Sequence, residues 1–337
     1  MTVGRLAAIF GCLGPDLAPE ERDFFRDTDP FGFILFARNV DNPVQLRRLT
    51  HDLREAVGRD APILIDQEGG RVQRMRAPHW REWLPPLDMA RLARDPVQAM
   101  WLRGRIIAHE LRGVGIDANC APCADVARPE THPFLRNRCL SDDPRQVATL
   151  ARSLAEGQAD GGVLSVVKHL PGHGRATADS HKDLPRVTAP MVELIETDFA
   201  PFRALNDLPM AMTGHMVFDA IDPENPTTQS AAMISVIRDQ IGFSGLLMTD
   251  DLNMLALSGD LTSRTARSMA AGCDLALHCK GDLAEMQVVA AACGDMGPAT
   301  LDRAERALLA RKAPGSVDIT ALEATLRAIM PGEADVV

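Results

Sequence analysis

The segment VLSVVK, residues 163–168, is a short apolar run that follows two glycines and ends on a charged side chain. Seven further apolar runs of four to six residues are spread along the chain, at 6–10, 32–36, 63–66, 116–121, 210–214, 246–250 and 273–278. Short apolar runs bounded by turn residues are typical of buried strands. The chain is therefore predicted to contain eight strands.

The longer segments between these runs carry the signals of amphipathic helices. Asn42 stands before Pro43 at the start of 44–57, where leucines recur at helical spacing. An Asn or Asp in this position caps the first turn, and a proline at the first helical position loses no needed donor. The same pairing opens two further segments, at Asp95-Pro96 and Asp143-Pro144.

Strands that alternate with helices indicate an α/β protein built from βα units around a parallel sheet. We predict a single (β/α)8 TIM-type barrel domain over residues 1–337, because such barrels run to about 250 residues or more as one unit. Two apolar-periodic segments, 298–311 and 319–329, follow the helix of the eighth unit. They are expected to be extra C-terminal helices that close the outside of the barrel.

The composition excludes several kinds of partner. The chain has 36 Lys and Arg against 46 Asp and Glu, a formal net charge of -10, which argues against nucleic acid and anionic membrane surfaces. No apolar run reaches the length of about 18 residues that a membrane-spanning helix needs.

Seven scattered cysteines predict a reducing, cytoplasmic location. Cys120 and Cys123 are expected to be small apolar side chains in a buried strand.

Polar residues follow the third predicted strand. The stretch DQEGGRVQR, residues 66–74, brings two carboxylates, two arginines and a glycine pair to the end of that strand. The long connections 67–95, 122–142 and 171–188 all follow strands, and barrel enzymes build their sites from such connections. The stretch could bind a polar ligand, or it could be an ion-pair cluster that supports the loop.

The fifth strand runs into a second polar cluster, KHLPGHG at 168–174, followed by Asp179 and His181. His169 and His173 have the spacing of a helical metal pair, but the proline and glycine between them argue against a helix. Asp179 is instead placed to orient the imidazole of His181, and histidine is suited to general acid/base catalysis near neutral pH. The alternative is a surface loop with incidental histidines.

The seventh strand emerges into Asp250 and Asp251. One of these carboxylates could be a nucleophile, or the pair could cap the next helix. His215 follows the sixth strand and could be catalytic or structural. An acid/base histidine and a nucleophilic Asp, together with Asp, Arg and Lys side chains that could bind a polar ligand (the polar grip), fit the hydrolysis of a polyhydroxylated substrate. Glycoside cleavage is one such reaction.

These motifs resemble one family. The chain is similar to glycoside hydrolase family 3, and within it to the NagZ-type bacterial β-N-acetylglucosaminidases. The resemblance covers nearly the whole chain and rests on three segments in family order: IDQEGGRVQR at 65–74, KHLPGHG at 168–174 with DSH at 179–181, and TDDLNM at 249–254.

The resemblance implies a role for each of these side chains. Asp250 would be the nucleophile that forms a covalent glycosyl-enzyme intermediate, and Asp251 would be structural. His181 would replace the usual carboxylic acid/base, with Asp179 as its partner. The family's sugar-binding positions match Asp66, Arg74, Arg138, Lys168 and His169.

The resemblance further implies a retaining, exo-acting enzyme without metal or cofactor. It would remove terminal β-linked N-acetylglucosamine from peptidoglycan fragments, GlcNAc-1,6-anhydro-MurNAc and its peptides, in cytoplasmic cell-wall recycling. A monomer acting on this small-molecule substrate is expected. The chain has no tyrosine, although sugar sites often use aromatic platforms.

Two alternatives remain open at this stage. A metal-dependent barrel hydrolase would use His169, His173 and His215 together with the acids of the seventh strand. A non-catalytic amino-sugar-binding protein would keep the polar grip without turnover.

Overall fold

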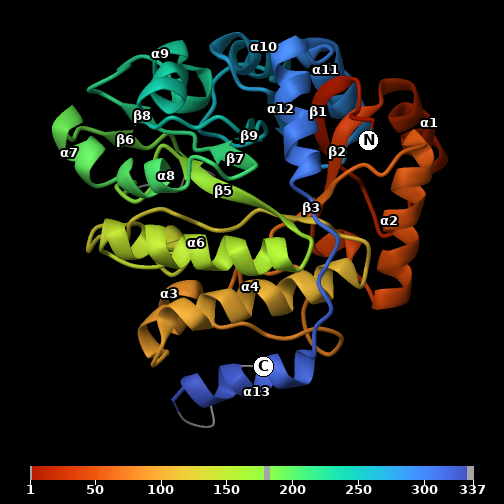
Figure 1. Cartoon of the computed structure of the whole chain (residues 1–337). Helices are drawn as coiled ribbons and strands as arrows, with labels where there is room; N and C mark the ends of the chain where they lie inside the picture. The colour runs from red at the N-terminus through yellow and green to blue at the C-terminus, as the bar shows by residue number, and fades with distance from the viewer. Residues whose placement is uncertain (1, 178–182, 332–337) are drawn as a thin grey trace.

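Eight parallel strands close into a barrel in the computed structural model, which describes residues 2–177 and 183–331 (Figure 1). Their order around the barrel is β1-β10-β9-β7-β5-β4-β3-β2, and β2 pairs back with β1. The predicted barrel is therefore confirmed. The strands are β1 (Leu6–Gly11), β2 (Pro30–Leu35), β3 (Ile63–Ile65), β4 (Ala118–Asn119), β5 (Leu164–Leu170), β7 (Met210–Thr213), β9 (Leu246–Asp251) and β10 (Leu275–His278).

Each predicted run overlaps one of these strands, with differences at the ends. The fourth run shortens to β4, because the chain turns at Ala121 and Pro122 into the long connection. A separate two-stranded sheet pairs β6 (Arg186–Val187) with β8 (Val217–Phe218). Sequence periodicity did not predict this sheet, since two residues are too few to show an alternation.

Helices surround the barrel and carry the predicted caps. Asn42 accepts hydrogen bonds from the backbone N–H groups of Val44 and Gln45 at the start of α2, and Asp95 and Asp143 cap α4 and α6. The helices before the C-terminal pair are α1 (Pro19–Thr28), α2 (Pro43–Val57), α3 (Pro86–Leu92), α4 (Pro96–Arg112), α5 (Pro133–Arg136), α6 (Pro144–Asp160), α7 (Met191–Glu196), α8 (Ala200–Ala204), α9 (Ala231–Ser235), α10 (Leu261–Ala271) and α11 (Leu283–Cys293). Within the residues described, no helix combines the length and apolar composition needed to cross a membrane.

The apolar core has two layers because side chains alternate along each strand. In β5, Leu164 and Val166 join the cluster inside the barrel, whereas Val163, just before the strand, and Val167 join the cluster between strands and helices. The barrel interior is therefore packed with side chains below the C-terminal ends of the strands.

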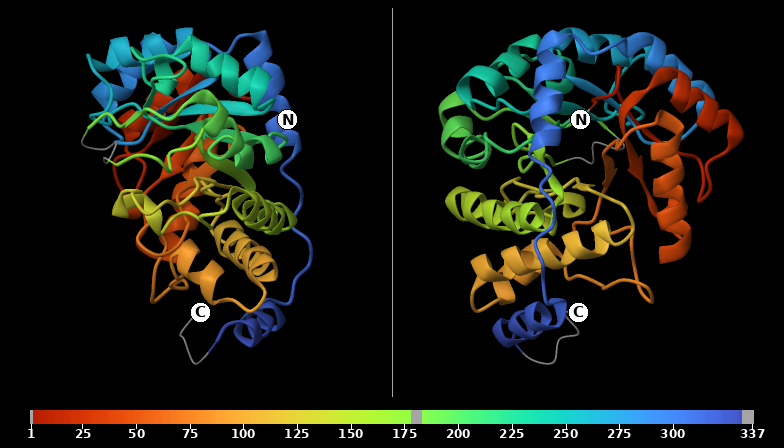
Figure 2. Two further views of the ribbon diagram at one scale, coloured as in Figure 1. Left: turned by 90° about the vertical axis from the view of Figure 1, so that its left-hand side faces the viewer. Right: turned by 45° about the vertical axis from the view of Figure 1, so that its right-hand side comes forward.

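The two extra C-terminal helices are present, but they occupy different surfaces. Ala304, Ala307 and Leu308 of α12 (Pro298–Leu309) pack with the cluster inside the barrel, so α12 covers the N-terminal end of the barrel rather than its outside. An extended segment then runs to α13 (Ile319–Ile329), which packs on the outside against α4 (Figures 1 and 2).

Asp274, immediately before β10, connects α12 to the barrel. Its buried carboxylate accepts hydrogen bonds from the guanidinium groups of Arg303, at 2.6 Å, and Arg238, at 2.6 Å. The same carboxylate accepts from the backbone N–H of Leu247 in β9 at 2.9 Å. One side chain therefore joins two strands and the covering helix.

Replacing Asp274 by Ala is expected to lower the free energy of unfolding by about 3 kcal/mol, because two partly buried arginines lose their carboxylate. Chemical denaturation followed by circular dichroism measures the change. The control Asp302→Ala removes an exposed carboxylate of α12 from its pair with Arg306 and should have little effect. Equal losses in both variants would contradict this account of how α12 is held.

Candidate active site

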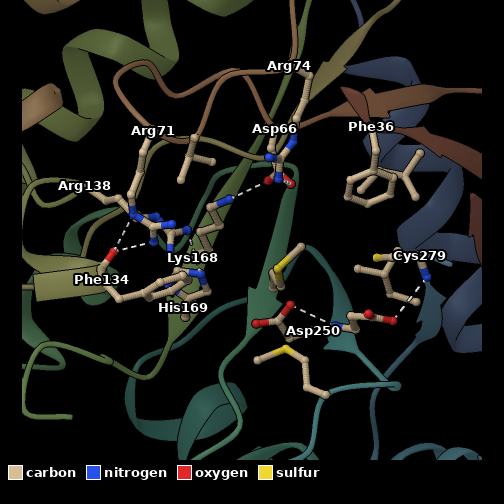
Figure 3. A pocket seen from close by; sticks show the side chains of 16 residues that line it. Phe36, Asp66, Arg71, Arg74, Phe134, Arg138, Lys168, His169, Asp250 and Cys279 are labelled. Carbon is tan, nitrogen blue, oxygen red and sulfur yellow. Dashed lines mark hydrogen bonds and ion pairs between the residues drawn. The ribbon is translucent and has the colours of Figure 1, made fainter. Parts of the chain in front are cut away.

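A pocket of about 250 Å³ opens at the C-terminal ends of the barrel strands (Figure 3). Six of the eight predicted site residues line it, and they come from four separate parts of the chain. These residues are Asp66, Arg74, Arg138, Lys168, His169 and Asp250. The other two, Asp179 and His181, lie outside the described residues.

The alternation of the strands explains why the charged side chains point into the pocket. Leu164 and Val166 face the barrel interior, so Lys168, two residues on, faces the same axis at the mouth. By the same count, Asp250 continues the inward series of Leu246 and Met248. In β5 and β9, the apolar inward column therefore ends in a charged side chain at the pocket.

Asp66 joins two of the cations. Its Oδ1 atom lies 2.8 Å from Lys168 Nζ, and its Oδ2 atom lies 3.0 Å from Arg74 Nη2. Burial would raise the pKa of Asp66, but the charges of Lys168 and Arg74 hold it well below its ordinary value. Asp66 is therefore a carboxylate at neutral pH.

Glu68 completes the network from the buried side. Its carboxylate accepts two hydrogen bonds from Arg138, at 2.8 and 2.9 Å, and lies 2.6 Å from Lys168 Nζ. Burial opposes its charge, yet Arg138 and Lys168 lower the pKa of Glu68 from 4.5 to about 2. In the sequence, Glu68 belongs to the stretch 66–74 and has no predicted role. Its position between two predicted sugar-binding cations arises only in the fold, because Arg138 and Lys168 lie far along the chain.

Buried side chains hold the backbone that carries Asp66 and Glu68. The Gln67 side chain accepts from the backbone N–H groups of Arg74 and Met75, which closes the loop on itself. Gly69 has a φ of +107°, and a Cβ atom there would lie 1.9 Å from the buried Arg103 guanidinium. Glycine is therefore required at this position, because the arginine that supports the loop occupies the space of a side chain.

His169 is oriented by a residue that the sequence analysis missed. The Asp125 carboxylate, in the loop after β4, lies 2.7 Å from His169 Nδ1 and accepts from the backbone N–H of His173 at 2.6 Å. Asp125 is fully buried. Its sequence signal was only an acid in the long connection 122–142 after the fourth strand.

Asp250 lies at the C-terminal end of β9, where hydrogen bonds hold the backbone and its carboxylate. The Oδ1 atom of Asp250 accepts from the backbone N–H of Asp251 at 2.8 Å. The Asp251 carboxylate accepts from the backbone N–H groups of Asn253 and Cys279, which fits the structural role expected for it. His215 is buried, with Nδ1 at 2.7 Å from Thr228 Oγ1 and Nε2 at 3.0 Å from the Asp251 carbonyl.

The histidine set of the metal hypothesis does not assemble within the described residues. His215 uses both ring nitrogens in the hydrogen bonds above, and neither His173 nor His215 belongs to the group of possible ligand atoms that lie close together in the described part of the chain. The cluster that comes within metal-ligating distance is a different one, Cys123, Asp125 and His169. Its members already hydrogen-bond to one another through the Asp125 carboxylate.

Aromatic side chains line the rim of the pocket. The Arg71 guanidinium stacks 3.6 Å from the centre of the Phe134 ring, and Phe36 lies near Arg74. Figure 3 shows Arg138, Lys168 and His169 together on one side of the pocket, with Asp250 across from Asp66. A carboxylate that faces a charged, hydrogen-bonding grip is the arrangement of a barrel enzyme acting on a polyhydroxylated substrate.

Comparison with known proteins gives the family. The family model described as "Glycosyl hydrolase family 3 N terminal domain" matches residues 9–309. The beta-hexosaminidase of Bordetella avium (strain 197N) is 35% identical over 311 residues, 89% of this chain and 87% of that protein. The beta-hexosaminidase of Alkalilimnicola ehrlichii is 38% identical over 286 residues, 83% of this chain and 81% of that protein. The chain therefore belongs to glycoside hydrolase family 3.

Solved structures agree with this assignment. NagZ from Neisseria gonorrhoeae, in complex with N-trifluoroacetyl-D-glucosamine, is similar with a TM-score of 0.87 at 27% identity. The similarity covers 98% of this chain and 99% of that chain, so it includes the barrel and the appended helices.

Replacing Glu68 by Gln is expected to lower the free energy of unfolding at pH 7 by about 3 kcal/mol, because the folded-state pKa lies far below the ordinary value. A depressed carboxyl pKa stabilises the fold above the unfolded value of 4.5, and this stability is lost as the pH falls through about 2. The difference in the free energy of unfolding between wild type and variant should therefore become smaller below pH 4.5. Urea unfolding at a series of pH values measures it.

The control for this experiment is Glu82→Gln. Glu82 pairs with Arg76 in the same connection, but its side chain is 48% exposed, so little change is expected at any pH. A Glu68→Gln difference that stays constant from pH 7 to about pH 3 would show that the charge of Glu68 does not stabilise the fold.

Proposed function

We propose that this chain is a retaining, exo-acting β-N-acetylhexosaminidase. It would remove terminal β-linked N-acetylglucosamine from peptidoglycan fragments, in particular GlcNAc-1,6-anhydro-MurNAc and its peptides, during cell-wall recycling. The observation that carries the proposal is the Asp250 carboxylate facing the grip of Asp66, Arg74, Arg138 and Lys168. The relatives named beta-hexosaminidase and the amino-sugar analogue bound to the similar Neisseria protein support the same substrate class.

In the proposed first step, a carboxylate oxygen of Asp250 attacks the anomeric carbon, and the bond to the leaving oxygen breaks. The hydrogen bond from the Asp251 backbone N–H holds this carboxylate in place, and His215 holds the Asp251 carbonyl. A preorganised nucleophile loses little entropy on the way to the transition state. The product of the step is a glycosyl ester on Asp250.

We propose His181 as the group that protonates the leaving oxygen and then activates water for the second step. Asp179 would orient its imidazole. Water attacks the anomeric carbon, the ester bond to Asp250 breaks, and N-acetylglucosamine leaves. A histidine can exchange its proton near neutral pH, which suits both halves of this cycle.

The grip binds hydroxyls and amides by charge-assisted hydrogen bonds. Asp66 supplies acceptors, and Arg74, Arg138 and Lys168 supply donors, all on side chains held by other groups. We propose that His169 adds a further contact to the sugar. A single chain provides every one of these residues, which is compatible with action as a monomer.

We further propose that residues 1–337 act as one catalytic domain in the cytoplasm, without metal or cofactor. All seven cysteines are free in the structure, and Cys120 and Cys123 are buried. Unpaired thiols are typical of a reducing compartment.

Asp250→Ala is expected to reduce kcat for an aryl β-N-acetylglucosaminide by 10⁴-fold or more, on the order found when a covalent catalytic residue is removed. Added azide should restore turnover and give the α-glycosyl azide, because a small anion can occupy the place of the lost carboxylate. A coupled chromogenic assay and product analysis measure both effects.

Asp260→Ala is the matched control, since Asp260 only caps α10 and should leave kcat unchanged. Wild-type enzyme should also turn over the aryl β-N-acetylglucosaminide faster than the matching aryl β-glucoside. Wild-type turnover in Asp250→Ala would reject this nucleophile, whereas a preference for the glucoside would reject the proposed substrate class.

His181→Ala is expected to remove the neutral-range limb from the pH profile of kcat/KM, because that limb reports the acid/base group of the free enzyme. Substrates with a poor leaving group should lose more activity than activated aryl glycosides, which need less protonation. The exposed His79 provides the control variant His79→Ala, with an unchanged profile expected. If His181→Ala kept the neutral-range limb of the pH profile of kcat/KM, another residue would have to be the acid/base group.

A further inference from the structure

The Asp125 carboxylate receives four hydrogen-bond donors at once. Its Oδ1 atom accepts from the backbone N–H groups of His173, at 2.6 Å, and His169, at 3.3 Å. Its Oδ2 atom lies 2.7 Å from His169 Nδ1 and 3.2 Å from Cys123 Sγ. The two oxygens therefore have different tasks, one toward the backbone after β5 and one toward side chains.

A carboxylate in this position determines where the imidazole of His169 carries its proton. A deprotonated carboxylate only accepts, so the short contact requires hydrogen on Nδ1. On the other side of the ring, His169 Nε2 lies 3.3 Å from Arg138 Nη2, and a guanidinium only donates. Both neighbours therefore require the same tautomer, with hydrogen on Nδ1 and a lone pair on Nε2.

Arg138 cannot turn away from this contact at low cost. Its Nε and Nη2 atoms are held by the two oxygens of Glu68, at 2.9 and 2.8 Å, and its side chain is 8% exposed. A hydrogen on His169 Nε2 would thus face a fixed donor. The ring offers Arg138 an acceptor only while the Asp125 carboxylate accepts from the other nitrogen.

We propose that Asp125 is a positioning residue, which sets the tautomer of His169 and so makes Nε2 the acceptor of a hydrogen bond from Arg138 that holds this guanidinium in place for the substrate. This inference rests on the proposed function, because it concerns how the same site binds its sugar. Asp125 touches neither the pocket nor the reacting atoms, and it acts through His169 and through the backbone that leads to His173.

Asp125→Asn separates the two tasks of the carboxylate. The amide oxygen can still accept from the backbone N–H groups of His169 and His173, which leaves the amide nitrogen facing His169 Nδ1. That nitrogen is a donor, so Nδ1 must become the acceptor and the proton must move to Nε2, opposite Arg138. This isosteric change is thus expected to move the proton of His169 from Nδ1 to Nε2, while the backbone of the loop stays hydrogen-bonded to residue 125.

The tautomer can be read directly by NMR on protein labelled with ¹⁵N-histidine. The His169 signals are assigned by their absence in His169→Gln. In the wild-type enzyme, hydrogen should be found on Nδ1, and in Asp125→Asn it should be found on Nε2. Hydrogen on Nε2 in the wild type, or an unchanged tautomer in the variant, would overturn the proposal.

Kinetics give the functional half of the test. With an aryl β-N-acetylglucosaminide, Asp125→Asn should raise KM by about 10- to 100-fold and change kcat less, because the charged Arg138 loses its hydrogen bond to His169 and its fixed position in the pocket. A wild-type KM would overturn the proposal. The NMR result needs no turnover, so failure of the proposed hydrolase activity and failure of this inference are distinguishable.

Asp117→Asn is the matched control for a buried Asp. Asp117 is equally buried, accepts from the backbone N–H of Ile63 at 2.8 Å and pairs with Arg54, but it lies before β4, at the end of the barrel away from the pocket. Its replacement should lower the melting temperature without changing KM or the His169 tautomer. An equal rise of KM in both variants would mean that Asp125 matters only for stability.

Discussion

A buried lysine charge at the end of β5 constrains the whole catalytic face. The Lys168 side chain is 2% exposed, and an ammonium group removed from water is costly unless carboxylates surround it. Asp66 and Glu68 meet this demand at 2.8 and 2.6 Å. Both lie on the connection after β3, so that connection must fold over the barrel mouth, and the bidentate pair with Glu68 then fixes Arg138.

Each member of this network is held by another protein group. Under the proposed function, these donors and acceptors would need little reorganisation to bind sugar hydroxyls, which is how polar sites gain both affinity and rate. The same principle applies across the pocket, where the turn after Asp250 is held by Asp251 and His215. The lack of tyrosine is no obstacle to such a site, since charged groups form the grip and phenylalanines line the rim.

The barrel could be predicted because each strand is a buried run with turn residues around it, and Asn or Asp before proline marked the helix starts. The surface that α12 covers could not be predicted, because an apolar helix face does not specify its partner. Asp125 was missed for a similar reason. Its partner His169 lies 44 residues further along the chain, and only the parallel pairing of β4 with β5 brings the ends of these two strands together. The catalytic and sugar-binding roles of all eight predicted site residues stay predictions, and Asp179 and His181 lie outside the described residues.

The central claim is that Asp250 forms a covalent bond to the sugar, so that the configuration at the anomeric carbon is retained after two displacements. Proton NMR of the reaction mixture, recorded before mutarotation, identifies the anomer released first from an aryl β-N-acetylglucosaminide. The account predicts β-N-acetylglucosamine as the first product. Initial formation of the α anomer would mean a single displacement by water and would contradict a glycosyl-Asp250 intermediate.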